Sequence, residues 1–122
     1  MVCDDSALAR KMAKRSLPDG FAAQISEAAN GHEALTKLSE QRVDLLILDL
    51  TMPELDGIGV LEAIKANQFE VFVIVVSGDI QPMMRERVMQ LGALDFIPKP
   101  VKPDAINNVL EKYGFILSDA MA

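Results

Sequence analysis

Two short apolar runs, at residues 43–48 and 71–76, stand out along the chain, and both consist mainly of Val, Leu and Ile. Such runs are typical of strands that are buried on both faces, as they are in a parallel sheet. Three shorter stretches, at 1–3, 23–27 and 93–97, are further strand candidates with fewer β-branched residues, and in the second of them only Ala23 and Ile25 are apolar. The pattern therefore predicts five strands.

Apolar residues with helical spacing fill the segments between these strands. Ser6 is a suitable N-cap for a helix that places Leu8 and Met12 on one face and ends near residue 17, before Pro18-Asp19-Gly20. Asn30-Gly31 opens a second helix that runs to about residue 41. Three more helices are indicated by apolar residues three or four positions apart, in the sets Val60, Leu61 and Ile64; Met84, Val88 and Leu91; and Ile106, Val109, Leu110 and Tyr113.

The alternation of strands and helices predicts an α/β fold. Five βα units joined by right-handed crossovers make a doubly wound, five-stranded parallel sheet with helices on both faces. A chain of 122 residues suits one such domain. We expect the domain to span residues 1–117, and residues 118–122 to form a tail or the start of a linker.

Charge and cysteine content exclude several classes of protein. Twelve basic and eighteen acidic residues give a net charge of -6, which argues against binding to nucleic acid or to an anionic membrane surface. The single cysteine, Cys3, cannot form an internal disulfide and lacks the partners of a zinc site. No signal peptide opens the sequence, and no apolar run approaches the ~20 residues that cross a bilayer. These features predict a cytoplasmic protein.

Chemically active side chains fall where the predicted strands end. Asp4 and Asp5 follow the first strand, Asp49 ends the third, Ser77 ends the fourth and Lys99 follows the fifth. In open α/β sheets the ligand site lies beyond the carboxyl ends of the strands. We therefore expect these five side chains to meet at one rim of the sheet.

Three carboxylates at one rim repel one another. At about 5 Å and an effective dielectric constant of about 20, each pair costs roughly 3 kcal/mol, so the site must bind a proton or a cation. A ligand set made only of oxygen atoms favours a hard divalent ion, either Mg²⁺ or Mn²⁺. Asp49 is a candidate nucleophile because carboxylates form aspartyl phosphates, and the metal, the Ser77 hydroxyl and the Lys99 ammonium would neutralise the phosphoryl oxygens. The residues predict a divalent-metal phosphoryl site.

Taken together, the motifs closely resemble the receiver domain of two-component response regulators. The resemblance covers essentially the whole chain, and it implies the strand order 2-1-3-4-5. It rests on motifs that occur in the family's order and at suitable spacing: the acidic pair Asp4-Asp5, the segment Leu48-Asp49-Leu50-Thr51-Met52-Pro53 followed by Asp56-Gly57, the segment Val76-Ser77-Gly78, and Lys99-Pro100.

The resemblance implies that Asp49 accepts a phosphoryl group from a histidine kinase. Asp5, Asp49 and the backbone carbonyl of Thr51 would ligate Mg²⁺, and Asp4 would act through a metal-bound water. Apart from its own phosphorylation and dephosphorylation, such a domain catalyses no reaction.

The resemblance also implies a conformational switch. Ser77 and Lys99 would contact the phosphoryl oxygens, Ser77 would shift toward them, and Phe96 would turn inward behind it. That change would remodel the face made by the fourth helix, fifth strand and fifth helix, where partners bind. The Lys99-Pro100 bond is expected to be cis, and Thr51 and Asp79 are expected to tune the lifetime of the phosphoryl group.

Alternative functions of the same architecture remain open at this point. A phosphatase with an aspartyl nucleophile would need a second acid two residues after Asp49, where this chain has Thr51. An FMN-binding protein would need a phosphate loop where the Asp4-Asp5 pair repels phosphate. A protein-binding module without phosphorylation would not need the acids, Ser77 and Lys99 together.

The output is also open. A single-domain regulator of the chemotaxis type, acting by docking to an output protein or a phosphatase, suits the length. A receiver fragment of a longer regulator with a missing output domain also suits the sequence. We expect a monomer or weak dimer that binds neither nucleic acid nor membrane.

A few other residues have simpler interpretations. Cys3 is expected to be buried and His32 exposed. Met83 and Met89 fall outside the apolar stripe of their helix and form a candidate partner surface. Family members usually have several apolar residues before the acidic pair, whereas only residues 1–3 precede it here, so we hypothesise a short first strand.

Overall fold

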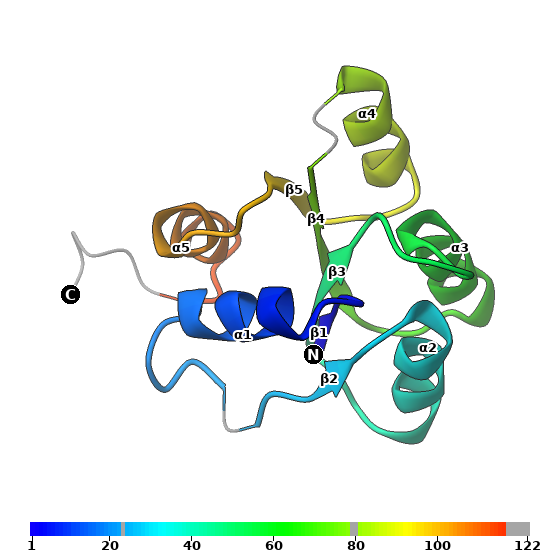
Figure 1. The fold of residues 1–122 in the computed structure, drawn as a ribbon, viewed down its shortest axis with the longest axis horizontal. Coiled ribbons are helices and arrows are strands. Elements are labelled where there is room, and N and C mark those ends of the chain that lie inside the picture. The colour runs from blue at the N-terminus through cyan, green and yellow to red at the C-terminus, as the bar shows by residue number, and fades with distance from the viewer. Residues whose placement is uncertain (23, 79–80, 117–122) are drawn as a thin grey trace.

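A computed structural model describes residues 1–22, 24–78 and 81–116 (Figure 1). In this part of the chain five strands alternate with five helices, as the sequence predicts. In chain order the elements are β1 (Val2–Cys3), α1 (Ala7–Ser16), β2 (Glu27–Ala28), α2 (Gly31–Glu40), β3 (Leu45–Asp49), α3 (Gly57–Asn67), β4 (Phe72–Ser77), α4 (Pro82–Gln90), β5 (Asp95–Pro98) and α5 (Pro103–Lys112). The tail expected at 118–122 lies outside the described residues.

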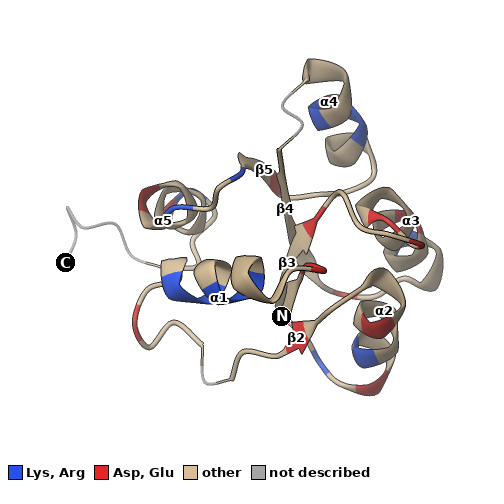
Figure 2. Ribbon diagram, viewed as in Figure 1, with Lys and Arg blue, Asp and Glu red and all other residues tan. Residues whose placement is uncertain are grey.

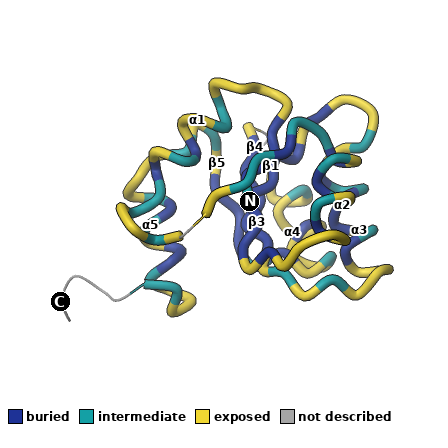
Figure 3. Tube along the Cα trace, turned by 90° about the horizontal axis from the view of Figure 1, so that it is seen from below, coloured by how far each residue is buried: buried dark blue, intermediate teal, exposed yellow. Residues whose placement is uncertain are grey.

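The strands form one parallel sheet in the order β2-β1-β3-β4-β5, which confirms the predicted fold class and topology. Alternate residues of each strand face opposite sides of this sheet. On β3, Leu46 and Leu48 pack in the core under α2, α3 and α4, whereas Leu45 and Ile47 pack in the core under α1 and α5. The two helical layers lie on opposite sides of the sheet (Figure 1), and β3 at its centre is buried along its whole length (Figure 3).

The second strand differs from its predicted position. The sequence indicated residues 23–27, but the described strand is Glu27–Ala28. It pairs with Val2 and Cys3 of β1 and therefore cannot begin earlier than β1 does. Ala28 is fully buried, whereas Gln24 and Ile25 are exposed, so the preceding stretch lacks the burial that stabilises a strand. The short first strand that we hypothesised is present.

Helix α1 presents its larger apolar residues to solvent. Ser6 caps it as predicted, accepting a hydrogen bond from the Ala9 N–H. Leu8 and Met12 share a face, but that face is exposed, and the helix buries only small residues, Ala13 and Ser16. Two basic residues of α1, Arg10 and Lys14, form ion pairs with Glu27 of β2. The ribbon in Figure 2 marks the basic positions of α1 and the acidic position of β2.

No helix among the described residues is both long and apolar enough to cross a bilayer.

Candidate functional site

The carboxyl ends of the strands bring the predicted side chains to one rim. Asp4 directly follows β1, Asp49 is the last residue of β3, Ser77 is the last residue of β4, and Lys99 directly follows β5. The Lys99 N–H donates to the Ser77 carbonyl oxygen at 2.8 Å, which ties the end of β5 to the end of β4. The parallel arrangement thus gathers residues that lie up to 95 positions apart in the sequence.

Three carboxylates meet at this rim. One oxygen from each of Asp4, Asp5 and Asp49 lies within 4.8 Å of the other two. Asp4 and Asp49 are buried, whereas Asp5 is exposed. The donor set is entirely oxygen and opens to solvent through Asp5, so the residues fit a hard divalent cation such as Mg²⁺.

Lys99 is placed between the two buried carboxylates. Its Nζ lies 2.8 Å from Asp4 Oδ2 and 3.1 Å from Asp49 Oδ1. Asp4 also accepts a hydrogen bond from the Ser6 N–H at 2.9 Å, and Asp49 accepts one from the Thr51 N–H at 3.3 Å. The two buried carboxylates therefore share the Lys99 ammonium, and each also accepts a hydrogen bond from one backbone N–H.

The charges at the rim perturb one another. Burial raises the pKa of Asp49 above its usual range, and the nearby Asp4 carboxylate raises it further, although Lys99 and the Thr51 N–H oppose both effects. Burial alone would lower the pKa of Lys99, but hydrogen bonds to Asp4 and Asp49 outweigh it and raise that pKa. The rim therefore stabilises the charged form of Lys99 and destabilises the ionised form of Asp49. A cation bound beside Asp49 would stabilise its ionised form.

The loop after Asp49 is held against the strand end by a glycine. The Gly57 N–H donates to the Leu50 carbonyl at 2.9 Å, and Asp56 caps α3 by accepting from the Gly59 N–H at 2.9 Å. A Cβ at residue 57 would lie 2.7 Å from Leu50 Cα and 2.8 Å from the Asp49 carbonyl oxygen. Asp56-Gly57 belongs to the motif identified in the sequence, but its physical role, the close approach of α3 to the acid-bearing strand end, is visible only in the structure.

The match to known families agrees with this geometry. A sequence model of the response regulator receiver domain matches residues 1–111. The chain belongs to this family. Receiver domains are signalling modules of two-component systems, so the resemblance inferred from the motifs is confirmed.

Relatives of this receiver domain occur alone and as parts of longer proteins. It is 38% identical over 112 residues to the chemotaxis protein CheY of Listeria monocytogenes, covering 92% of this chain and 94% of that protein. It is also 38% identical over 106 residues to a protein-glutamate methylesterase/protein-glutamine glutaminase of Clostridium acetobutylicum, covering 84% of this chain but 31% of that protein. Among solved structures, CheY in the CheX–CheY–BeF₃–Mg²⁺ complex of Borrelia burgdorferi is similar, with a TM-score of 0.85 at 27% identity over 93% of this chain and 86% of that one. The chemotaxis protein CheY4 of Vibrio cholerae is also similar, with a TM-score of 0.81 at 26% identity over 91% of this chain and 93% of that one.

The residues expected to act in a switch lie behind the rim. Ser77 is fully buried, and Phe96 on β5 is 6% exposed and packs in the core under α2, α3 and α4. The Lys99-Pro100 bond is cis, as the resemblance implied. Thr51 is exposed at the rim, and Asp79 lies outside the described residues.

Cys3 lies beneath the rim, buried as predicted. Its Sγ is 3.5 Å from the Asn30 carbonyl oxygen and 3.7 Å from Met52 Sδ. Burial raises the pKa of the Cys3 thiol to about 12, and the carboxylates of Asp4 and Asp49 raise it as well. Cys3 is therefore a neutral packing residue, and it is not among the residues whose ligand atoms cluster at the rim.

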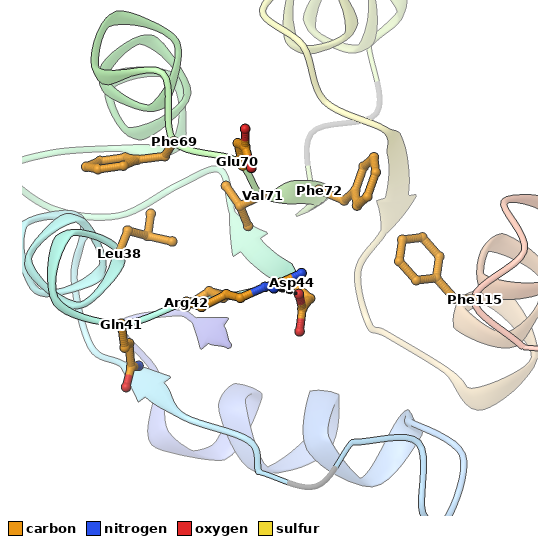
Figure 4. A pocket seen from close by; sticks show the side chains of 10 residues that line it. Leu38, Gln41, Arg42, Asp44, Phe69, Glu70, Val71, Phe72 and Phe115 are labelled. Atoms are coloured by element: carbon orange, nitrogen blue, oxygen red, sulfur yellow. Dashed lines mark hydrogen bonds and ion pairs between the residues drawn. The ribbon is translucent and has the colours of Figure 1, made fainter.

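The opposite, amino end of the sheet contains larger hollows. One of about 900 Å³ is lined by aromatic side chains, with Phe72 and Phe115 in edge-to-face contact and Phe69 on the far side (Figure 4). Arg42 and Asp44 form an ion pair at its edge. None of the three rim acids, Ser77 or Lys99 lines this hollow, so it is not part of the candidate phosphoryl site.

Proposed function

We propose that this receiver domain accepts a phosphoryl group on Asp49 in a Mg²⁺-dependent reaction, with a phosphohistidine of a histidine kinase as the donor. The observation that carries the proposal is the cluster at the rim, in which Lys99 lies between Asp4 and Asp49 and a third carboxylate, Asp5, completes an oxygen ligand set. Repulsion among three carboxylates exceeds what one ammonium offsets, so the cluster is suited to a divalent cation and then a phosphoryl group.

The metal site would use residues from two strand ends, those of β1 and β3. Asp5, Asp49 and the Thr51 backbone carbonyl would hold Mg²⁺, and Asp4 would contribute through a metal-bound water. Mg²⁺, when bound, would neutralise charge on the phosphoryl oxygens. Asp5 is exposed and can admit the ion without rearrangement of the core.

The transfer itself requires little covalent chemistry from the protein. A carboxylate oxygen of Asp49 would attack phosphorus as the phosphorus–nitrogen bond to the donor imidazole breaks, and the bonding electron pair would leave with that nitrogen. The Lys99 ammonium and the Ser77 hydroxyl would stabilise the charge on the phosphoryl oxygens. The domain would catalyse only this transfer and the hydrolysis of the resulting acyl phosphate, in which water takes the phosphoryl group, inorganic phosphate leaves and the Asp49 carboxylate is restored.

The acyl phosphate would then shift the domain between two states. Ser77 would move toward the phosphoryl group, Phe96 would favour its inward position, and the face formed by α4, β5 and α5 would be remodelled for an output protein or a phosphatase. Such coupling is typically worth ~1–3 kcal/mol. Thr51 and Asp79 would tune how long the phosphoryl group survives.

The match to 94% of the length of the CheY relative favours a regulator that acts by docking, as a monomer or weak dimer in the cytoplasm. A receiver within a longer regulator, as in the methylesterase relative, is the alternative. The two differ in the attached output domain and share the chemistry at Asp49.

A labelling experiment tests the phosphoryl transfer. The chain is incubated with acetyl phosphate, with and without Mg²⁺, and phosphorylation is followed by intact-protein mass spectrometry. We expect one added phosphoryl group that requires Mg²⁺ and is lost in Asp49→Asn. Asp44→Asn is the matched control, because Asp44 is an exposed aspartate just before the same strand. Labelling that persists in Asp49→Asn, or labelling that does not depend on Mg²⁺, would contradict the proposal. If the chain, given phosphate esters in place of acetyl phosphate, releases inorganic phosphate from them over many turnovers, it is a phosphatase.

A further inference from the structure

Arg10 joins helix α1 to the backbone of the acidic pair. Its Nη1 donates to the Asp4 carbonyl oxygen at 2.7 Å, and its Nε lies 3.1 Å from Glu27 Oε1 on β2. The Arg10 side chain is only 17% exposed, although arginine is mostly a surface residue. One guanidinium therefore bridges the strand end that carries Asp4 and Asp5 and the neighbouring edge strand.

The Asp4 carbonyl belongs to the peptide group that leads into Asp5. The remaining polar groups of Asp4 are also held. Its N–H donates to the Ala28 carbonyl at 3.1 Å, and its carboxylate accepts from the Ser6 N–H and from Lys99. Asp5 differs, because in the described part of the chain no hydrogen bond or ion pair reaches its exposed carboxylate. The direction of the Asp5 carboxylate therefore depends on how the Asp4–Asp5 peptide is held.

An arginine suits this bridging position. Two nitrogens of one planar guanidinium bond two acceptors at once, a geometry that a lysine ammonium on a flexible stem does not reproduce. The Glu27 carboxylate accepts from Arg10 at Oε1 and from Lys14 at Oε2. The hydrogen bonds from Lys14 and Arg10 lower the pKa of Glu27, so Glu27 stays ionised and offsets the charge of Arg10 near the rim.

We propose that Arg10 is a positioning residue for the Mg²⁺ site, which holds the Asp4–Asp5 peptide so that the Asp5 carboxylate faces the rim, and that Glu27 fixes the guanidinium. This role rests on the proposed function, in which Asp5 is a direct ligand of the ion. Groups that orient a metal ligand without touching the metal typically change metal affinity by about 10–100-fold.

Lys14 offers a matched comparison on the same helix. It bonds the same Glu27 carboxylate at 3.0 Å, but among the described residues it makes no contact with Asp4. If these basic residues only tied α1 to β2, Arg10→Met and Lys14→Met would have equal effects. If they acted only through charge, both variants would strengthen Mg²⁺ binding, because each removes a cation from the neighbourhood of the ion. Positioning alone predicts a loss of affinity confined to Arg10→Met.

Backbone relaxation of the ¹⁵N-labelled chain without metal tests the peptide contact itself. The Asp5 N–H belongs to the peptide group that Arg10 holds, so in the unchanged chain its order parameter should lie near the ~0.85 of rigid backbone. It should fall toward ~0.6 in Arg10→Met and stay unchanged in Lys14→Met. An unaltered order parameter in Arg10→Met would overturn the inference whether or not the site binds metal.

A Mg²⁺ titration followed by amide chemical shifts at the rim measures the consequence for the site. We expect about tenfold weaker binding in Arg10→Met and a change of about twofold at most in Lys14→Met. The loss in Arg10→Met, relative to the unchanged chain, should persist in about 1 M KCl, where a Debye length of ~3 Å screens effects of charge alone. Asp5→Asn removes the ligand itself and should weaken binding at least as much as Arg10→Met.

Failure of the positioning role and failure of the metal site give different results. If the unchanged chain binds Mg²⁺ through Asp5 and Arg10→Met binds it as tightly, the positioning role is wrong and the proposed function stands. Equal losses in Arg10→Met and Lys14→Met would indicate a structural tie between α1 and β2 and would also overturn the inference. Absence of Mg²⁺ binding by the unchanged chain would overturn the proposed function and, with it, this role of Arg10.

Discussion

The two ends of the sheet use the same strands for different purposes. At the carboxyl end, Lys99 lies within hydrogen-bond distance of both Asp4 and Asp49, and these two acids are buried at the ends of paired strands. At the amino end, hollows of about 900 and 550 Å³ separate the elements, and Phe72 is 56% exposed. A site that gathers like charges needs a rigid support, whereas the far end of the same strands tolerates loose packing.

Truncating apolar side chains should reveal the largest difference in stability between the buried centre of the sheet and its amino end. Leu48 is fully buried next to Asp49, and Leu48→Ala should lower the free energy of unfolding by about 3 kcal/mol. Phe72→Ala, at the amino end of the sheet, should lower the free energy of unfolding by about 1 kcal/mol. The Phe72 ring is half exposed, and its removal chiefly eliminates the contact with Phe115. Urea unfolding measures the stability of both variants. Equal losses of unfolding free energy would show that the amino end of the sheet is packed as firmly as its centre.

The second test removes the cation from the rim. Lys99→Met leaves Asp4 and Asp49 facing each other in a buried setting, so we expect a loss of about 2 kcal/mol without metal. Mg²⁺ should restore more stability to this variant than to the unchanged chain. Lys102→Met, at an exposed lysine three residues later, is the matched control. An unchanged melting temperature in Lys99→Met would contradict the ion pairs at the rim.

A smaller effect should distinguish two glycines near the same rim. Gly57→Ala forces a methyl group against the backbone of Leu50 and Asp49 and should cost about 1–2 kcal/mol. Gly78→Ala meets no atom within 4 Å and should leave stability nearly unchanged. Thermal unfolding of the two variants measures the difference, and equal melting temperatures would show that α3 does not need its close approach to the strand end.

The smallest change concerns Cys3, which packs under the rim. With a pKa of about 12 in the folded chain, against 9.0 for an ordinary thiol, its thiolate fraction at pH 8 is lower by about three orders of magnitude. Alkylation by iodoacetamide at pH 8 should be at least ~100-fold slower than in urea. Because the folded state holds this proton more tightly, the associated stability is present below pH 9 and is lost as the pH rises toward 12. Equal alkylation rates in buffer and urea would contradict the burial of Cys3.

The sequence could predict the fold and the membership of the rim, because both follow from strongly patterned segments. The apolar runs that became β3 and β4 mark the sheet centre, and the carboxyl ends of parallel strands necessarily converge. Asp4, Asp49 and Lys99 could therefore be placed together before their distances were known.

Other features depend on tertiary contacts that a single sequence does not encode locally. The position of β2 is fixed by pairing with Val2 and Cys3, so its weak local pattern was misplaced toward residue 23. Leu8 and Met12 have helical spacing, but which face of α1 is buried depends on how it packs against α5. The steric role of Gly57 also requires the position of a strand end seven or eight residues away.

Titration with beryllofluoride, an analogue of the phosphoryl group, tests most directly whether the rim is a Mg²⁺-dependent phosphoryl site. Amide spectra of the ¹⁵N-labelled chain would be recorded with beryllofluoride alone, with Mg²⁺ alone and with both. We predict that only the combination shifts residues around Asp49 and Lys99 together with the face formed by α4, β5 and α5, and that Asp49→Asn abolishes the response. Spectra unchanged by the combination, or the same response in Asp49→Asn, would contradict the account.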